Sequence, residues 1–283
     1  MTDFFNPRLA LGLTNRYPLA YIKSREERRL VKQLESLSKT HYGDSRPVHI
    51  WTCSEGLDGN LALADPLAVI RHIRSASDDG LFLLKDMPSL FESNPVLVRA
   101  LRDLYEYLLG TRKYVFLSHP GFLLPEELRG QAWFVDLGMP DAQEIASHLH
   151  GLLEQFKRLS DVDENWILQV VTAMKGLGLE EITHLLYGWD TENRFDLLSV
   201  LDDVYANKTA SLQKEGCLQF MPKNLRVEDV GGLENLKEWV LSRKSLFSRQ
   251  SFQEGVPMPA GILFMGISGC GKSLAAKVIA GAW

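Results

Sequence analysis

Short apolar runs alternate with longer segments of helical periodicity in the first half of the chain. The runs are rich in β-branched and aromatic residues and lack a regular apolar–polar alternation, which is typical of strands covered on both faces of a parallel sheet. They lie at residues 18–22, 48–53, 81–84, 114–118 and 133–137. Five such strands joined by four crossovers predict an α/β domain with a doubly wound, parallel, five-stranded sheet.

The segments between these strands carry the start and stop signals of helices. Asp65 and Asn94 each precede a proline, which places a capping side chain just before a proline at the first helical position. Leucines then recur at helical spacing from Leu97 to Leu108, and Gly110 ends the pattern. We therefore expect a helix to begin after each of the two capping residues.

After residue 140 the strand patterns cease, and only helical patterns follow up to a break near Gly216. An amphipathic helix is then expected at residues 233–247, behind a Gly-Gly pair, and an apolar strand at residues 261–265. The predicted parts are an α/β domain (1–140), a helical subdomain (141–216) and a third part (217–283).

The sequence GISGCGKS directly follows the expected apolar strand and satisfies the pattern GxxxxGK(S/T). Its glycines allow positive φ angles and close approach of the backbone, so that successive N–H groups can enclose phosphates. Lys272, the candidate catalytic residue, would reach the β and γ phosphates, Ser273 would bind Mg²⁺, and the following helix would present its positive dipole end. The candidate nucleotide-binding residues are Gly266, Ile267, Ser268, Gly269, Cys270, Gly271, Lys272, Ser273 and Leu274. The alternative is a glycine turn that binds nothing.

Cys270 lies inside this loop, beside a helix N-terminus and Lys272, and such surroundings favour a reactive thiol. One hypothesis is that oxidation or alkylation of Cys270 blocks nucleotide binding, so that bound ATP would protect the thiol from iodoacetamide. The alternative is that a small side chain simply fits this position.

Composition narrows the class of protein further. The 283 residues are 45% hydrophobic and 24% charged, as in globular proteins, and the formal charge of −5 gives no general attraction to nucleic acids or anionic membranes. Cys53, Cys217 and Cys270 lie far apart without CxxC spacing, which argues against disulfides and zinc and favours a reducing compartment. The first residues do not resemble a secretory signal, and no segment approaches the roughly 20 apolar residues of a membrane span. A cytoplasmic protein is therefore expected.

The segments VEDVGGLENLKEWV and GVPMPAGILFMGISGCGKSLAAKVIA resemble the opening of an AAA-family ATPase module. Earlier segments, YPLAYIKSREERRL, VHIWTC, GLFLLKD and KYVFLSHP, resemble one branch of that family, the AAA ATPases of the chloroplast hypothetical reading frame type and their bacterial relatives. The resemblance implies ATP and Mg²⁺ as ligands, an adenine site at Asp229, Val230 and Gly231, and a homo-oligomer, commonly a hexamer. It also implies that residues 141–216 are a helical lid and that residues 217–283 begin a second, P-loop-containing AAA module.

The same resemblance places a phosphate loop of the first domain at residues 23–29, but no glycine is present there. Ser24 and Glu27 instead match an S-x-x-E capping box, which would satisfy the free N–H donors of the helix start. Lys85 stands where an active module offers paired carboxylates. His119 follows the next strand, either as a remnant of a polar sensor or partner contact or as an ordinary loop histidine. We therefore expect a degenerate AAA-like domain that binds no nucleotide.

Hydrolysis of ATP in this family requires a later strand that ends in Asp-Glu, a sensor residue and an arginine finger from a neighbouring subunit. None of these follows Ser273 in the sequence. The chain is therefore expected to be the first part of a longer protein, cut within its catalytic module, with residues 217–283 poorly packed by themselves.

The predicted function is ATP binding by an ATP hydrolase that remodels or regulates an unknown partner protein, with the first domain as a non-catalytic scaffold or adaptor. The alternative is an ATP-dependent binding switch with little turnover, and a P-loop kinase or GTPase fits the Gly-Gly-Leu helix less well. The expected location is the cytoplasm, or the stroma in an organism with plastids.

Overall fold

The computed structural model describes residues 6–43, 46–77, 79–214, 231–243 and 261–282. The chain forms two compact units, residues 1–201 and 202–283. The division into three parts that the sequence suggests stays a prediction.

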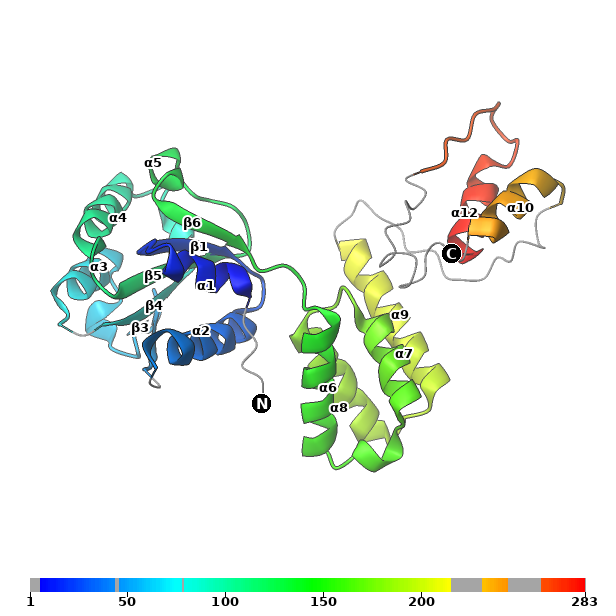
Figure 1. Ribbon diagram of the computed structural model, residues 1–283, viewed down its shortest axis with the longest axis horizontal. Coiled ribbons are helices and arrows are strands. Elements are labelled where there is room, and N and C mark those ends of the chain that lie inside the picture. Colours follow the sequence, from blue (N-terminus) through cyan, green and yellow to red (C-terminus); the bar gives the residue numbers. More distant parts are fainter. Residues whose placement is uncertain (1–5, 44–45, 78, 215–230, 244–260, 283) are drawn as a thin grey trace. The chain divides into compact units, whose positions relative to one another are not determined.

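A six-stranded sheet lies at the centre of the first part of the chain (Figure 1). The strands are β1 (Leu19–Lys23), β2 (Val48–Thr52), β3 (Gly56–Leu57), β4 (Gly80–Lys85), β5 (Lys113–His119) and β6 (Ala132–Asp136). They follow the order β3-β2-β4-β5-β1-β6, and all neighbours except β3 and β2 run parallel. The predicted α/β class and all five predicted strands are confirmed.

The prediction of five strands in all was wrong, because β3 adds a sixth strand at one edge. It pairs antiparallel with β2 through Trp51 and Leu57 and through Thr52 and Gly56. Two residues are too few to produce a hydrophobic period, so the sequence pattern gave no signal for this strand.

Helices cover both faces of the sheet. One face is covered by α1 (Pro7–Thr14) and α2 (Glu27–Tyr42), and the other by α3 (Pro66–Ser75) and α4 (Pro95–Leu108). Successive residues of β1 show the two layers, since Leu19 and Tyr21 pack in the core under α3 and α4, whereas Ala20 and Ile22 pack under α1 and α2. The short helices are η1 (Leu61–Leu63), η2 (Met87–Leu90) and α5 (Glu126–Arg129). This is the doubly wound arrangement that the sequence predicts.

Both predicted helix caps are present. The Asp65 carboxylate accepts a hydrogen bond from the Ala68 N–H at 2.7 Å, and the Asn94 side chain accepts one from the Leu97 N–H at 3.2 Å. Each cap therefore satisfies one of the free donors at its helix start, as a side chain before a first-turn proline should.

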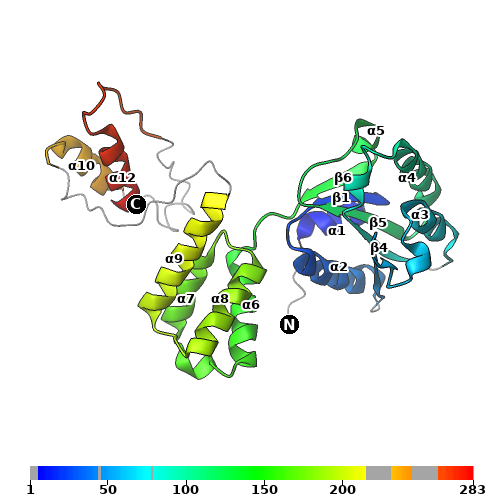
Figure 2. The same ribbon diagram turned by 180° about the vertical axis from the view of Figure 1, so that it is seen from behind.

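Between the sheet and Lys214, where every residue is described, only helices follow, as predicted. They are α6 (Ala142–Gln155), η3 (Leu159–Asp161), α7 (Glu164–Met174), α8 (Leu179–Glu192) and α9 (Leu197–Lys214). Figure 2 shows α6, α7 and α8 from behind. Ile145, Leu149, Leu186 and Trp189 are buried among them, and the Trp166 and Trp189 rings meet edge to face with centroids 6.2 Å apart.

The second unit begins within α9, and its described residues also contain α10 (Glu234–Arg243) and α12 (Lys272–Ala282). The expected helix over 233–247 is thus present from residue 234 to 243, and residues 244–247 lie outside the described residues. Val240 of α10 and Val278 of α12 are buried where the two helices pack together.

The strand expected at residues 261–265 is absent, and that prediction was wrong. The described residues of the second unit contain no other strand, so the segment has no partner for the N–H and C=O groups of a ladder. Its apolar side chains are exposed accordingly, with Leu263 at 84% and Met265 at 83%.

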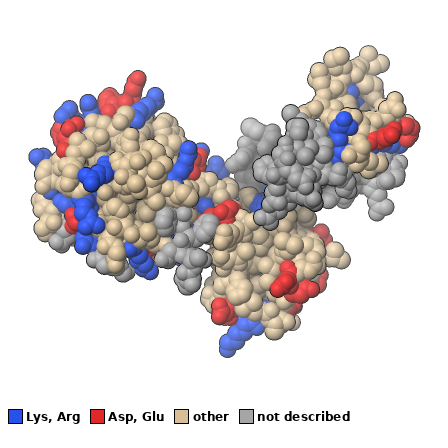
Figure 3. All heavy atoms as spheres, viewed as in Figure 1, with Lys and Arg blue, Asp and Glu red and all other residues tan. Residues whose placement is uncertain are grey.

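Basic and acidic side chains are mixed on the surface of the molecule. Figure 3 shows Lys and Arg side chains interspersed with Asp and Glu side chains on the face in view. Within the described ranges, no helix combines the length and the apolar character that a membrane crossing requires.

Candidate nucleotide-binding site

Residues 266–271, here called the glycine loop, turn sharply before the start of α12. Gly269 has φ +83° and Gly271 has φ +87°, a left-handed backbone that side chains with a Cβ rarely adopt. A Cβ on Gly266 would lie 2.8 Å from the Cys270 Sγ, so a larger residue there would require the Cys270 side chain to shift. Gly269 and Gly271 therefore each have a local structural reason.

Lys272 folds back over the glycine loop. Its ammonium group donates hydrogen bonds to the carbonyl oxygens of Gly266 at 2.9 Å and Ile267 at 2.5 Å, and it lies 3.6 Å from the Cys270 Sγ. The positive charge is thus held directly above the loop, where an anion enclosed by the loop would meet it.

The start of α12 supplies the remaining groups. The first helical residue is Lys272, and the Ala275 N–H donates to the Gly271 carbonyl at 2.9 Å. The N–H groups of the preceding residues have no partner within a helix and carry the positive end of the helix dipole. Ser273 lies in this first turn and is exposed, and Leu274 beside it is 43% exposed.

Of the three adenine contacts expected from the resemblance, only Gly231 lies among the described residues. Asp229 and Val230 lie outside the described residues, whereas Gly231 is exposed and precedes α10. The structure therefore brings together the residues from Gly266 to Leu274, and it leaves the three adenine candidates as predictions.

The glycine loop, Lys272 and the α12 start can together hold an anion. The donors are backbone N–H groups at a helix start and one ammonium, a set that suits the phosphates of a nucleotide. Ser273 offers one exposed hydroxyl, which fits Mg²⁺ because this ion usually retains several waters and takes further oxygens from the substrate phosphates.

Residues 23–29 of the first unit, where the resemblance places a phosphate loop, differ in structure from the glycine loop. The predicted capping box of Ser24 and Glu27 was wrong: α2 begins at Glu27, its N-cap is Glu26, and Glu26 makes no side-chain cap bond there. The Ser24 hydroxyl instead accepts a hydrogen bond from the Glu26 N–H at 3.1 Å. A short turn closed by this hydrogen bond is therefore present in place of the predicted S-x-x-E capping box.

Ion pairs occupy the carboxyl end of the sheet. Glu27 pairs with Lys85 at 2.8 Å, and Lys23 pairs with Asp136 at 2.9 Å. The Lys23 hydrogen bond is the main reason why the pKa of Asp136 is lowered. His119 accepts a hydrogen bond at Nδ1 from the Gly121 N–H at 3.0 Å, the contact of a histidine that shapes its own loop.

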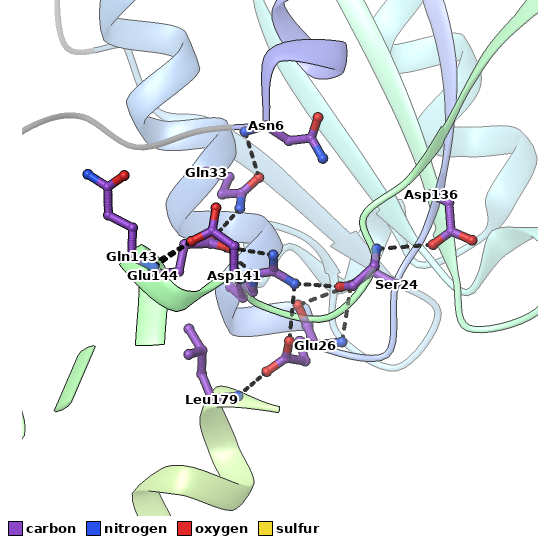
Figure 4. A network of polar contacts seen from close by, with 11 residues as sticks. Asn6, Ser24, Glu26, Gln33, Asp136, Asp141, Gln143, Glu144 and Leu179 are labelled. Carbon is purple, nitrogen blue, oxygen red and sulfur yellow. Dashed lines mark hydrogen bonds and ion pairs between the residues drawn. The ribbon is translucent and has the colours of Figure 1, made fainter. Parts of the chain in front are cut away.

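The buried Arg29 is the centre of a polar network. Figure 4 labels three of its partners, Glu26, Gln33 and Glu144. The Arg29 guanidinium donates to both carboxylate oxygens of Glu144, at 3.1 and 2.6 Å, and to the Gly138 carbonyl at 2.6 Å. It also lies 3.3 Å from the Glu26 carboxylate, and Gln33 donates to Glu144 at 2.9 Å. The network joins α2 to the start of α6.

Glu26 extends this network to α8. Its carboxylate accepts a hydrogen bond from the Leu179 N–H at 2.5 Å, at the first residue of that helix. Burial raises the pKa of Glu26, although the Leu179 N–H and the Arg29 charge act in the opposite direction. Figure 4 shows Glu26 directed toward Leu179.

This network was not predicted from the sequence. Its signal was present as Arg29 and Gln33, two polar residues four positions apart on the buried face of α2. A second signal was Asp141-x-x-Glu144, a capping box that the structure contains, with Asp141 accepting from the Glu144 N–H at 2.9 Å.

Comparison with known proteins shows what the chain resembles. Residues 5–137 match the family model described as SpoVK-like AAA ATPase, N-terminal domain. The uncharacterized AAA domain-containing protein ycf46 of Pyropia yezoensis is 30% identical over 287 residues, which cover 99% of this chain and 57% of that protein. The ycf46 protein of Guillardia theta is 30% identical over 280 residues, with coverages of 96% and 54%. The chain thus spans a little over half the length of these relatives.

Among solved structures, a chain from the E. coli MS115-1 HORMA:CdnC:Trip13 complex aligns with a TM-score of 0.49 and 13% identity, covering 70% of this chain and 77% of that chain. The resemblance read from the sequence is confirmed by the family model and the ycf46 relatives. The α/β part matches the N-terminal domain of SpoVK-like AAA ATPases, and the chain along nearly its whole length resembles the AAA domain-containing ycf46 proteins.

Proposed function

We propose that the chain binds MgATP through the glycine loop, Lys272 and Ser273. The observation that carries the proposal is the Lys272 ammonium, which lies over the loop carbonyls of Gly266 and Ile267 at the start of α12. The backbone N–H groups and this ammonium would bind the phosphates, and Ser273 would contribute a hydroxyl to Mg²⁺. Asp229, Val230 and Gly231 are the proposed adenine contacts.

Lys272 is also the proposed catalytic residue. Its fixed positive charge beside the β and γ phosphates would stabilise the charge that develops during phosphoryl transfer, and Mg²⁺ held by Ser273 would supply further positive charge. The full-length protein is proposed to hydrolyse ATP in a homo-oligomer and to use the energy to remodel or regulate a partner protein. The similarity to AAA proteins supports this proposal.

The N-terminal unit is proposed to be a non-catalytic scaffold or adaptor. Support comes from the start of α2, where the partly buried Glu26 and the Glu27–Lys85 ion pair take the place of a glycine-rich loop. Two carboxylates in this position oppose the binding of phosphate. The proposed location is the cytoplasm, or the stroma in an organism with plastids.

Isothermal titration of the chain with MgATP tests the nucleotide site. Replacing Lys272 by Ala should abolish measurable binding, because a charge-assisted contact to the phosphates is lost. Lys277→Ala, which removes an exposed lysine of the same helix, should leave the affinity unchanged. Equal loss in both variants would contradict the proposed role of Lys272.

A further inference from the structure

The contacts between the α/β part and the helices α6 and α8 within the first unit start from α2. Arg29 and Gln33 of α2 bind Glu144 at the start of α6. Residue 138, whose carbonyl Arg29 also binds, lies in the short segment that connects β6 to α6. These bonds fix one end of α6, and by themselves they would leave the packed helices α6 and α8 free to turn together about that point.

Glu26 provides a second point of attachment. Its carboxylate binds the Leu179 N–H at 2.5 Å, and the exposed Arg28 lies 3.7 Å from Glu180 in the same turn of α8. Two attachments on two different helices prevent rotation, as a single one does not. The Glu26 side chain is only 12% exposed, so its bond to Leu179 is shielded from competing water.

A cavity lies beside this attachment. It has a volume of about 380 Å³ and lies between α2, α6 and α8, with Lys32, His148 and Thr183 in its walls. The surfaces are therefore not in continuous apolar contact at this position. Discrete bonds, rather than close packing, hold α2 and α8 at their distance.

Stability does not explain why a carboxylate occupies this position. Moving a carboxylate out of water costs several kcal/mol, and an ion pair recovers that cost only in part. Buried charged groups are better attested as devices that fix one arrangement among several. The start of α8 is a place where an external anion would be favoured, and here the chain provides the anion itself.

We propose that Glu26 is a built-in latch, whose carboxylate binds the start of α8 and Arg29 and thereby holds the helical part against the α/β part without any bound nucleotide. The latch is independent of the proposed ATP site, because all its groups belong to the first unit. It would make the first unit a rigid body in every nucleotide state of the protein.

Chemical cross-linking across α2 and α8 tests the latch in nucleotide-free protein. The full chain, with Cys53, Cys217 and Cys270 replaced by Ser, receives the substitutions Arg28→Cys and Glu180→Cys at the two positions whose side-chain ends lie 3.7 Å apart, and the rate at which a short bis-maleimide joins the two thiols is measured on denaturing gels. Glu26→Ala should slow the reaction about tenfold, which corresponds to the loss of one charge-assisted hydrogen bond. Sodium formate, which replaces the deleted carboxylate, should restore part of the rate.

Two further variants keep the test decisive. Glu27→Ala removes the neighbouring carboxylate, which pairs with Lys85 inside the α/β part, and should cross-link at the parent rate. Glu26→Asp keeps the charge, is expected to fold, and shortens the reach by one methylene, so it should also slow cross-linking. The proposal is overturned if Glu26→Ala or Glu26→Asp cross-links at the parent rate, or if Glu27→Ala slows the reaction as much as they do.

Discussion

Arg29 and Glu144 form a bidentate ion pair between α2 and α6, with nitrogen–oxygen distances of 3.1 and 2.6 Å. Both side chains are nearly buried, at 6% and 11% exposure. The planar guanidinium matches the carboxylate in a way that lysine cannot. This pair joins the sheet domain to the helices that follow it.

Replacing Arg29 by Met should therefore destabilise the first unit. The substitution leaves the Glu26 and Glu144 carboxylates buried without their cation, a change that costs roughly 3–5 kcal/mol in comparable pairs. Urea unfolding followed by circular dichroism measures the difference. Arg28→Met, on the same helix with an 88% exposed side chain, is the control and should change the free energy of unfolding by less than about 0.5 kcal/mol. Equal stability of Arg29→Met and the parent chain would show that the network carries no such energy.

His148 makes the stability of the first unit sensitive to pH. Burial lowers the pKa of His148 below its usual 6.5, and the nearby Lys32 charge acts in the same direction. The unfolded chain therefore binds a proton more readily than the folded one, so the stability that neutral His148 contributes is present above pH 6.5 and is lost as the pH falls through the lowered folded-state value.

The expected result is a free energy of unfolding that decreases on acidification below pH 6.5, and less steeply in His148→Gln. His150→Gln, at an exposed position of the same helix, should retain the parent slope. Urea titrations at several pH values give these slopes. A parent-like slope in His148→Gln would rule out His148 as the source.

The turn after β2 depends on one glycine. Gly56 has φ +77°, and a Cβ built on it would lie 1.9 Å from the Asn60 carbonyl oxygen. Gly59 has a similar φ of +82°, but the space around it is open. Gly59→Ala should thus cost only the strain of a positive φ, about 1–2 kcal/mol, whereas Gly56→Ala should cost more because the backbone must also move. Thermal unfolding of the two variants compares them, and equal midpoints would contradict the steric argument.

Cys270 should respond to nucleotide if the glycine loop encloses phosphates. Its thiol is exposed and lies 3.6 Å from the Lys272 ammonium. MgATP should therefore slow the reaction of Cys270 with iodoacetamide, because bound phosphates would cover the loop. The exposed Cys53 of the first unit is an internal control and should react at the same rate with and without ATP. Mass spectrometry of the two peptides reports both rates. If MgATP leaves the alkylation rate of Cys270 unchanged, bound phosphates do not cover this thiol.

The fold of the first unit could be predicted from local patterns wherever a segment was long enough to show a period. The apolar runs became β1, β2, β4, β5 and β6, and the caps at Asp65 and Asn94 start helices as expected. The two-residue β3 was missed because its pairing depends on a partner strand and not on its own sequence. The strand predicted at residues 261–265 is absent for a related reason. An apolar run forms a strand only beside another strand, and a local pattern does not show whether that partner is present.

The glycine loop and the Arg29 network differ in how far the sequence predicts them. The glycine loop is contiguous, so one motif specified all residues from Gly266 to Ser273. The Arg29 network is assembled from α2, α6 and α8, and motif reading selected the wrong capping pair, Ser24 and Glu27, for its first helix. Long-range polar networks depend on tertiary contacts that no local pattern encodes.

The most direct test of the proposed function is the stoichiometry of MgATP binding to the chain and to two variants. The proposal predicts about one ATP per chain by isothermal titration, no binding for Lys272→Ala, and unchanged binding for Lys23→Ala, whose lysine ends β1 of the first unit and pairs with Asp136. Binding that survives Lys272→Ala, or that is lost in Lys23→Ala alone, would place the nucleotide elsewhere and contradict the account.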